Sequence, residues 1–144
     1  MSKKSKNPGI ERKDCKKIVT FGSNKKMNGW LLELLSDRDG FTKHLKGQLY
    51  MTVVMPGDFK GFHLHALADY FVICIKGKVR HVVYTARGKK HENIMGDKNF
   101  KSVFVPRGCP HGLENIGRSS AYVLIYRYPA WDPLVKEQFD IPRK

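Results

Sequence analysis

Two histidines lie two residues apart in an otherwise apolar stretch, and their chemistry gives the first indication of a functional site. His63 and His65 flank Leu64 in the segment after Gly61. Residues i and i+2 of an extended strand point to the same face, so both imidazoles would project together. Burying both would require a hydrogen-bond partner for every ring nitrogen removed from water. A single such histidine is more often a core residue, but the pair favours a cavity in which imidazoles exchange protons near neutral pH.

A third histidine follows a turn later in the chain. The segment from Pro106 to Asn115 has the spacing P-x-G-x-x-H-x-x-x-N, with His111 at its centre. An apolar run precedes it at 103–105 and a strand-like run follows at 121–126, so its proline and glycine indicate a turn that opens into a new strand. We expect the imidazole of His111 to converge with the first two in one barrel mouth.

We expect short strands separated by turns to position these rings. Apolar or alternating runs occupy 17–21, 29–35, 48–54, 70–75, 79–84 and 121–126. Such spacing is typical of an all-β sandwich or barrel, and a double-sheet jelly roll leaves an interior cavity for a site. The polar stretch 36–46 is predicted to be a loop with one helical turn, and the polar stretch after residue 84 is predicted to be a loop through Gly96. The stretch 134–144 is predicted to be a short helix or an extended tail.

Length and composition indicate one domain without a membrane span. The chain has 144 residues and no apolar run near the roughly 20 residues that a transmembrane helix needs. We divide it into a basic leader, residues 1–16, and a single domain, residues 17–144. Three cysteines without paired spacing indicate free thiols, and no apolar segment follows the basic N-terminus, so we expect a cytoplasmic protein.

The formal charge of +14 does not by itself indicate a nucleic-acid partner. Residues 1–26 hold nine of the 27 lysines and arginines, and the others are scattered. Scattered basic residues are usually a solvated face, and no nucleic-acid motif accompanies them. The positive electrostatic field of these residues would equally attract an anionic small substrate such as a nucleotide diphosphate.

The two histidine segments resemble the two signature motifs of the cupin superfamily. The first reads G-x5-H-x-H from Gly57, and the second is the segment around His111. From about residue 17 onward the chain resembles cupins related to dTDP-4-dehydrorhamnose 3,5-epimerase, which act on nucleotide-linked sugars. The matching pieces are 29–33, 47–52, 60–65, 69–71 and 106–112. The resemblance implies a double-stranded β-helix (jelly-roll) cupin barrel with little helix, a homodimer and no required metal or other cofactor.

The resemblance also implies roles for individual residues. His63 stands at the catalytic base, with a buried acidic partner expected to orient its ring, and Lys60 stands where an arginine usually contacts the substrate's phosphates. The epimerases carry a lysine at the position of Tyr70, and their general-acid tyrosine would fall near Ala130 or Trp131. The H-x-H arrangement is closer to sugar 3,4-ketoisomerases of the same superfamily.

Enolisation is the chemistry that this set could perform. A 4-keto sugar has an acidified C–H bond beside its carbonyl, and a neutral imidazole can take that proton. The enolate oxygen then needs a hydrogen-bond donor. We therefore predict an isomerase, an epimerase or ketoisomerase of dTDP- or UDP-linked 4-keto-6-deoxy sugars in surface polysaccharide or deoxysugar biosynthesis. The catalytic candidates are His63, His65 and Tyr70, and the substrate-binding candidates are Lys60, Arg80, Arg87, His111 and Tyr126.

Two alternatives remain open at this level. His63, His65 and His111 are also the ligand set of metal-binding cupins, and three imidazoles around one divalent metal ion would support metal-dependent chemistry. A cupin that binds a sugar without catalysis is the other alternative. For the basic candidates the competing interpretation is a solvated surface charge, and for Tyr70 it is a core aromatic residue.

Overall fold

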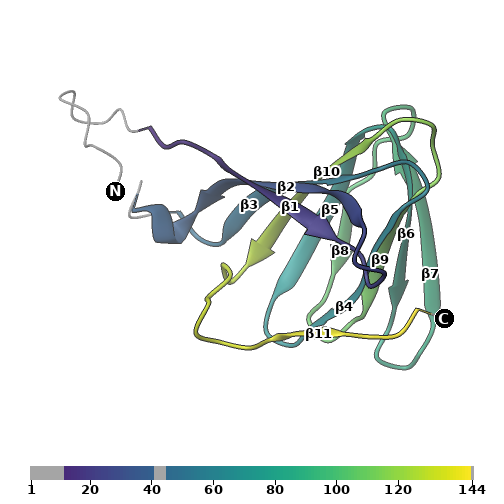
Figure 1. The fold of residues 1–144 in the computed structure, drawn as a ribbon. Helices are drawn as coiled ribbons and strands as arrows, with labels where there is room; N and C mark the ends of the chain where they lie inside the picture. The colour runs from purple at the N-terminus through teal and green to yellow at the C-terminus, as the bar shows by residue number, and fades with distance from the viewer. Residues whose placement is uncertain (1–11, 41–44, 144) are drawn as a thin grey trace.

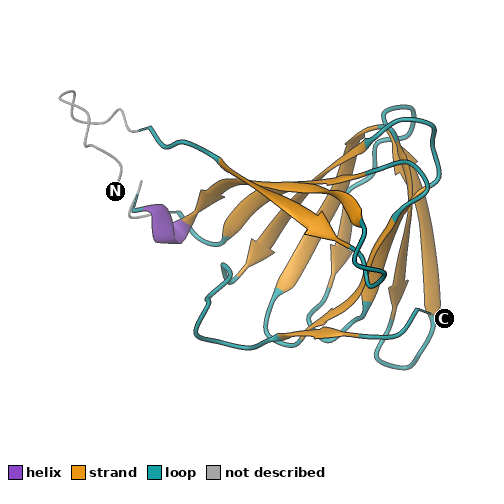
Figure 2. Cartoon of the chain, in the orientation of Figure 1, coloured by secondary structure: helices purple, strands orange, loops and turns teal. Residues whose placement is uncertain are grey.

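The computed structural model describes residues 12–40 and 45–143, and within them the chain forms two antiparallel β-sheets (Figure 2). One sheet has six strands in the order β1 (Lys16–Phe21), β2 (Met27–Ser36), β3 (Gln48–Val54), β10 (Ala121–Tyr128), β5 (Asp69–Lys76) and β8 (Val103–Val105). The other has five, in the order β11 (Gln138–Asp140), β4 (Phe59–His65), β9 (His111–Asn115), β6 (Lys78–Tyr84) and β7 (Lys90–Gly96). The prediction of an all-β jelly roll is confirmed.

The core lies between the two sheets and follows the alternation of the strands. On β5 the side chains of Tyr70, Val72 and Cys74 are buried, whereas Phe71 between them is exposed. On β10 the side chains also alternate, so Val123 and Ile125 point into this core. Because β-branched and aromatic side chains pack well on a pleated surface, the runs that predicted strands are also the runs that fill the interior.

Two glycines let β4 and β9 approach closely beside the histidines. A Cβ atom on Gly61 would lie 2.7 Å from the Cα of Gly112, and one on Gly112 would lie 2.5 Å from the ring of Phe59. The register of the pair shifts between Lys60 and His63, and beyond that shift His63 lies opposite His111. The close approach therefore sets two of the three predicted imidazoles on adjacent strands.

The segment after β10 is extended rather than helical and crosses to the other sheet. Its strand β11 pairs with β4, so that Gln138 lies opposite His65 and Asp140 opposite His63. Figure 1 shows this segment in yellow, running below the two sheets from the end of β10 towards the C-terminus. Of the two predicted possibilities for this stretch, the extended one is correct, and it carries new side chains to both histidines.

The polar loop predicted between residue 84 and Gly96 is wrong, because Lys90–Gly96 forms the strand β7, whereas the other predictions of local structure below agree with the described residues. One turn of 3-10 helix, Asp37–Asp39, follows β2 and is capped by Ser36. Cys15, Cys74 and Cys109 are free thiols. Residues 1–11 of the predicted basic leader lie outside the described residues, and β1 begins at Lys16. No helix in the described part of the chain is long and apolar enough to cross a membrane.

Candidate active site

A cleft of about 1030 Å³ brings the three predicted imidazoles together. His63 and His65 of β4 and His111 of β9 are among the residues that line it, as are Tyr50, Thr52, Lys60 and Tyr70. The rings of His63 and His65 have centroids 6.3 Å apart, and those of His65 and His111 are 5.8 Å apart. A smaller hollow of about 250 Å³ elsewhere is lined by apolar residues, Thr85, glycines and Tyr84 and carries no histidine or charged side chain. We therefore place the candidate site in the larger cleft.

His65 is oriented by a buried carboxylate. Its Nδ1 lies 3.1 Å from Oε1 of Glu137 and 2.9 Å from the hydroxyl of Tyr70. Burial raises the pKa of Glu137, but hydrogen bonds and charges from His65 and Arg127 outweigh this and lower it, so the carboxylate is ionised. Because an ionised carboxylate can only accept, Nδ1 of His65 carries the proton and donates to Glu137. The unprotonated Nε2 is then the nitrogen available to a molecule in the cleft.

The protonation of His65 itself is governed by burial. Desolvation lowers the pKa of its imidazole, although the hydrogen bond and charge of Glu137 act in the opposite direction. The ring is therefore neutral at neutral pH, as a general base must be. Arg127 lies 3.0 Å from the same Glu137 oxygen, so the buried carboxylate is shared between a cation and a neutral imidazole.

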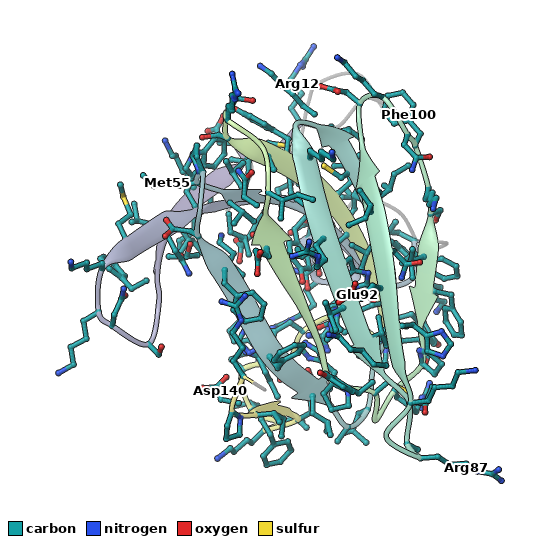
Figure 3. The ribbon with its side chains drawn as sticks, turned by 90° about the vertical axis from the view of Figure 1, so that its right-hand side faces the viewer. Arg12, Met55, Arg87, Glu92, Phe100 and Asp140 are labelled. Carbon is teal, nitrogen blue, oxygen red and sulfur yellow. The ribbon has the colours of Figure 1, made fainter. Side chains whose placement is uncertain are left out.

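His63 has an acidic partner as expected, but the partner is not buried. Its Nδ1 lies 2.9 Å from Oδ1 of Asp140, whose side chain is 87% exposed. The expectation of burial fails because β11 is an edge strand with exposed side chains. Figure 3 shows Asp140 on this strand, at the end of the sheet. The buried carboxylate of the site belongs to His65 instead, so the two rings differ in how firmly they are held.

His111 is held by another histidine. Nε2 of His81, on the neighbouring strand β6, lies 3.0 Å from Nδ1 of His111. His81 is 0% exposed, and burial lowers its pKa to about 4. The pKa of His111 is also well below its usual value. Burial is the largest cause, and the charges of His81, His65 and His63 lower the pKa further. Both rings of the pair are therefore neutral at neutral pH.

Two tyrosines of the six-stranded sheet, Tyr50 of β3 and Tyr70 of β5, extend the network. The hydroxyl of Tyr70 bonds His65, and a side-chain hydrogen bond joins Tyr70 to Tyr50. Burial raises the pKa of Tyr50 to about 12 and raises that of Tyr70 further above its usual value. Both phenols are therefore protonated at neutral pH. Tyr70 is a buried aromatic residue that also bonds His65, and its predicted catalytic role stays a prediction.

Lys60 is the predicted cation that does reach the cleft. Its ammonium donates to Oγ1 of Thr52 at 2.8 Å and to the carbonyl of Trp30 at 3.3 Å. Burial lowers its pKa to about 8. Arg143 also lines the cleft, with its guanidinium 4.1 Å from the ring centroid of Phe59 and an ion pair to Glu114.

Three predicted substrate-binding residues do not line the cleft. Arg80 alternates with the inward His81 and pairs with Glu114 at 3.1 Å. Arg87 lies at the tip of the turn between β6 and β7 and points away from both sheets (Figure 3). Tyr126 lies on the outer side of β10 and donates to the carbonyl of Lys46. Alternation along β6 and β10 explains two of these placements, and we do not retain any of the three in the site.

Five residues of the network were not singled out from the sequence: Tyr50, His81, Arg127, Glu137 and Asp140. Tyr50 could have been found, because it shares a strand face with Thr52 and Val54. His81 gave a weaker signal as a lone histidine in an apolar strand. The carboxylates gave none, since their place depends on the pairing of β11 with β4.

The three-histidine metal alternative stays a prediction. No group of three His, Cys, Asp or Glu side chains among the described residues is arranged to hold a metal ion. Nδ1 of His65 and of His111 is engaged by Glu137 and His81, so Nε2 is the nitrogen of each ring that is left for a ligand.

Comparison with known proteins finds relatives along most of the chain. The family model FdtA, described as WxcM-like, C-terminal, matches residues 13–133. The spore coat polysaccharide biosynthesis protein SpsL of Bacillus subtilis (strain 168) is 25% identical over 139 residues, which cover 92% of this chain and 89% of SpsL.

Solved structures share the fold at lower identity. The capsular polysaccharide assembling protein CapF of Staphylococcus aureus has a TM-score of 0.72 at 17% identity, over 88% of this chain and 34% of CapF. This chain thus spans about a third of the length of CapF. An oxalate oxidase in complex with glycolate has a TM-score of 0.63 at 20% identity, over 78% of this chain and 57% of that one. At these identities the likeness concerns the fold alone.

Proposed function

The chain belongs to the FdtA family, described as WxcM-like, C-terminal, and from this premise we propose that it is a sugar-nucleotide isomerase of polysaccharide biosynthesis. SpsL is a spore coat polysaccharide biosynthesis protein and CapF a capsular polysaccharide assembling protein, and both names support the polysaccharide context. The reaction that we propose is enolisation of a dTDP- or UDP-linked 4-keto-6-deoxy sugar without a metal ion.

The observation that carries the proposal is the pair of carboxylate-bound imidazoles on one face of β4. His63 bonds Asp140 and His65 bonds Glu137, and each interaction uses Nδ1, so Nε2 is left for the substrate. His63, the more exposed ring, removes the proton from the carbon beside the carbonyl. The enolate forms, and the proton returns to the adjacent, former carbonyl carbon. His65 meanwhile takes the proton of the neighbouring hydroxyl and gives it to the former carbonyl oxygen, so that the carbonyl moves by one position.

The same-face arrangement favours ketoisomerisation over epimerisation. Epimerisation requires a proton to arrive on the opposite face of the carbon from which the base took it. Ketoisomerisation moves a proton between adjacent carbons and can use bases on one side. His63 and His65 share a strand face. The position at which a general-acid tyrosine was expected holds Ala130 or Trp131, neither of which lines the cleft.

The cleft also offers sites for a nucleoside diphosphate. Lys60 and Arg143 line it and supply positive charge for the phosphates, in place of Arg80 and Arg87. Phe21, which is 65% exposed, lies at the rim and presents an aromatic face on which a nucleobase can stack. We also propose that the protein is a homodimer, as the family resemblance implies. An exposed aromatic row on the outer face of the six-stranded sheet, formed by Phe71, Phe104 and Tyr126, supports this.

Deuterium exchange tests the proposal directly. The protein is incubated in D₂O with dTDP-4-keto-6-deoxyglucose, and proton NMR follows exchange at C3 and the appearance of a 3-keto product. We expect His63→Ala to slow exchange by about 10²- to 10⁴-fold, the contribution of a general base. His91→Ala is the matched control, because His91 is exposed on β7 and does not line the cleft.

Each outcome separates the proposal from its alternatives. Exchange at the native rate in His63→Ala would remove His63 as the base. Exchange with inversion at C3 and no 3-keto product would establish an epimerase instead. Binding of dTDP without any exchange would indicate a sugar-nucleotide-binding cupin that does not catalyse.

A further inference from the structure

His111 differs from the other two imidazoles of the cleft in the partner that holds it. His63 and His65 each have a carboxylate beside Nδ1, whereas His111 has the ring of His81 there. A carboxylate accepts only, so it fixes the proton on Nδ1 of its histidine. A neutral imidazole can either donate or accept, so the proton position in the His81–His111 pair must be decided by the surroundings.

The unpartnered nitrogen of His81 decides where the protons of the His81–His111 pair lie. Nδ1 of His81 is buried and has no hydrogen-bond partner among the described residues. If His111 donated from Nδ1 to His81, the proton of His81 would sit on this orphan nitrogen as a buried N–H without an acceptor. If His81 donates from Nε2, the orphan atom is a lone pair instead. Orphaned buried N–H groups are rarer in proteins than orphaned acceptors, so the second arrangement is favoured.

The second arrangement determines what His111 presents to the cleft. Its Nδ1 accepts from His81, so a neutral ring carries its proton on Nε2. Burial keeps the ring neutral, and the two cleft rings beside it, His65 and Tyr70 with centroids 5.8 and 5.4 Å away, are not anions. His111 therefore offers a hydrogen-bond donor where His63 and His65 offer acceptors.

We propose that His111 is the donor to the substrate oxygen that becomes negative on enolisation, and that His81 is the positioning residue that fixes its proton on Nε2. This inference rests on the proposed function and adds a role that the base does not supply. The base takes the proton from carbon, the electron pair moves to the carbonyl oxygen, and Nε2–H of His111 hydrogen-bonds the resulting oxyanion. The proton of His111 stays on its nitrogen, so no further reactant is required.

The tautomer can be measured without a substrate. Long-range ¹⁵N–¹H NMR of the imidazoles in the resting protein at pH 7.5 distinguishes a protonated nitrogen from an unprotonated one, and single histidine substitutions assign the rings. We expect His81 and His111 to carry protons on Nε2 and His65 to carry its proton on Nδ1. A proton on Nδ1 of His111 would overturn the inference.

The catalytic role is tested with paired variants. We expect His111→Leu to lower kcat for C3 exchange by about 10²- to 10³-fold, the cost of losing one oxyanion donor, with dTDP affinity unchanged. His111→Gln keeps an amide N–H and should recover part of this loss. His81→Leu should lower kcat by about 10- to 100-fold, whereas His81→Gln, which can still donate to His111, should stay close to the native rate. His91→Leu is the surface control.

The outcomes distinguish failure of this inference from failure of the proposed function. A wild-type protein that exchanges no deuterium overturns the proposed function. An active wild-type protein whose His111→Leu variant keeps its native kcat overturns the inference alone. Unchanged dTDP affinity and thermal unfolding in each variant show that a lost rate is not lost folding. A KM increase at constant kcat in His111→Leu would also overturn the inference, because such a change would assign His111 to ground-state binding.

Discussion

Oε1 of Glu137 lies 3.1 Å from Nδ1 of His65, although 72 positions separate the two residues in the sequence. The contact exists because β11 pairs with β4 and sets its preceding residue over the histidine strand. Both side chains are buried, and Arg127 forms an ion pair with the same oxygen of the carboxylate. The interaction fixes which nitrogen of His65 faces the cleft.

Replacing Glu137 tests this interaction. We expect Glu137→Gln to lower the free energy of unfolding by about 3 kcal/mol, because Arg127 would remain buried without its counterion. The rate of C3 exchange should fall as well, since the amide can donate to Nδ1 of His65 and favour the wrong tautomer. Urea denaturation and the exchange assay measure the two effects.

Asp140→Asn is the matched control for that substitution. Its carboxylate also bonds a histidine but is 87% exposed, so the free energy of unfolding should change by less than about 1 kcal/mol. Equal destabilisation by the two substitutions would show that burial of Glu137 does not matter.

The buried His81 predicts a loss of stability in mild acid. Its pKa is about 4 in the folded protein and about 6.5 in an unfolded chain. Between these values the unfolded state binds more protons, so stability falls as pH drops from 6.5 to 4, by roughly 3 kcal/mol for this group. The lowered pKa values of His65 and His111 act in the same direction.

Urea denaturation at pH 7, 6 and 5 measures this slope. His81→Leu should flatten it, and His91→Leu should leave it unchanged. A slope that is the same in His81→Leu and the wild-type protein would contradict the assignment of a depressed pKa to His81.

Lys60 predicts a pH dependence of nucleotide binding. Its pKa is about 8 in the unliganded protein, so most of its positive charge is lost between pH 7 and pH 9. The affinity for dTDP should fall about tenfold over this interval, because only the charged form attracts phosphate. Lys60→Met should bind weakly at both pH values and lose the dependence, as isothermal titration calorimetry would show. Thymidine, which lacks phosphates, is the control ligand, and an unchanged pH profile in Lys60→Met would count against this role.

The aromatic row on the outer face predicts where a homodimer would form. Phe104 is 50% exposed, and its ring lies 5.1 Å from that of Phe71 on the next strand. Phe104→Asp should convert a dimer to a monomer in sedimentation velocity, because burying a charge in an apolar interface is costly. Phe100→Asp is the control, since Phe100 lies in the loop between β7 and β8, is 62% exposed and is not one of the three residues of the row. A wild-type protein that sediments as a monomer would exclude this interface.

The fold was largely readable from the sequence because its determinants are local. Alternation on 48–54 and the turns after it define strands without knowledge of their partners, and His63 and His65 share a face by the period of the strand alone. The convergence of His111 followed from motif spacing. Positive charge alone did not identify a substrate-binding residue in the case of Arg80, because it alternates with the inward His81 and points outward.

The orientation of the rings could not be read in the same way. Glu137 and Asp140 reach the histidines through a strand pairing across more than 70 residues, and no local pattern encodes that register. The partner of His111 is a lone histidine on another strand, which resembles an ordinary core residue until β6 and β9 are paired.

The extended segment after β10, which carries β11 to the other sheet, matters for how activity is inferred among relatives. The family match ends at residue 133, and both carboxylates come after it. A homologue could thus retain every imidazole within the matched region and yet differ in proton placement, if natural variation altered its last strand. Grafting this short strand between homologues would then transfer reactivity without changing a single catalytic histidine.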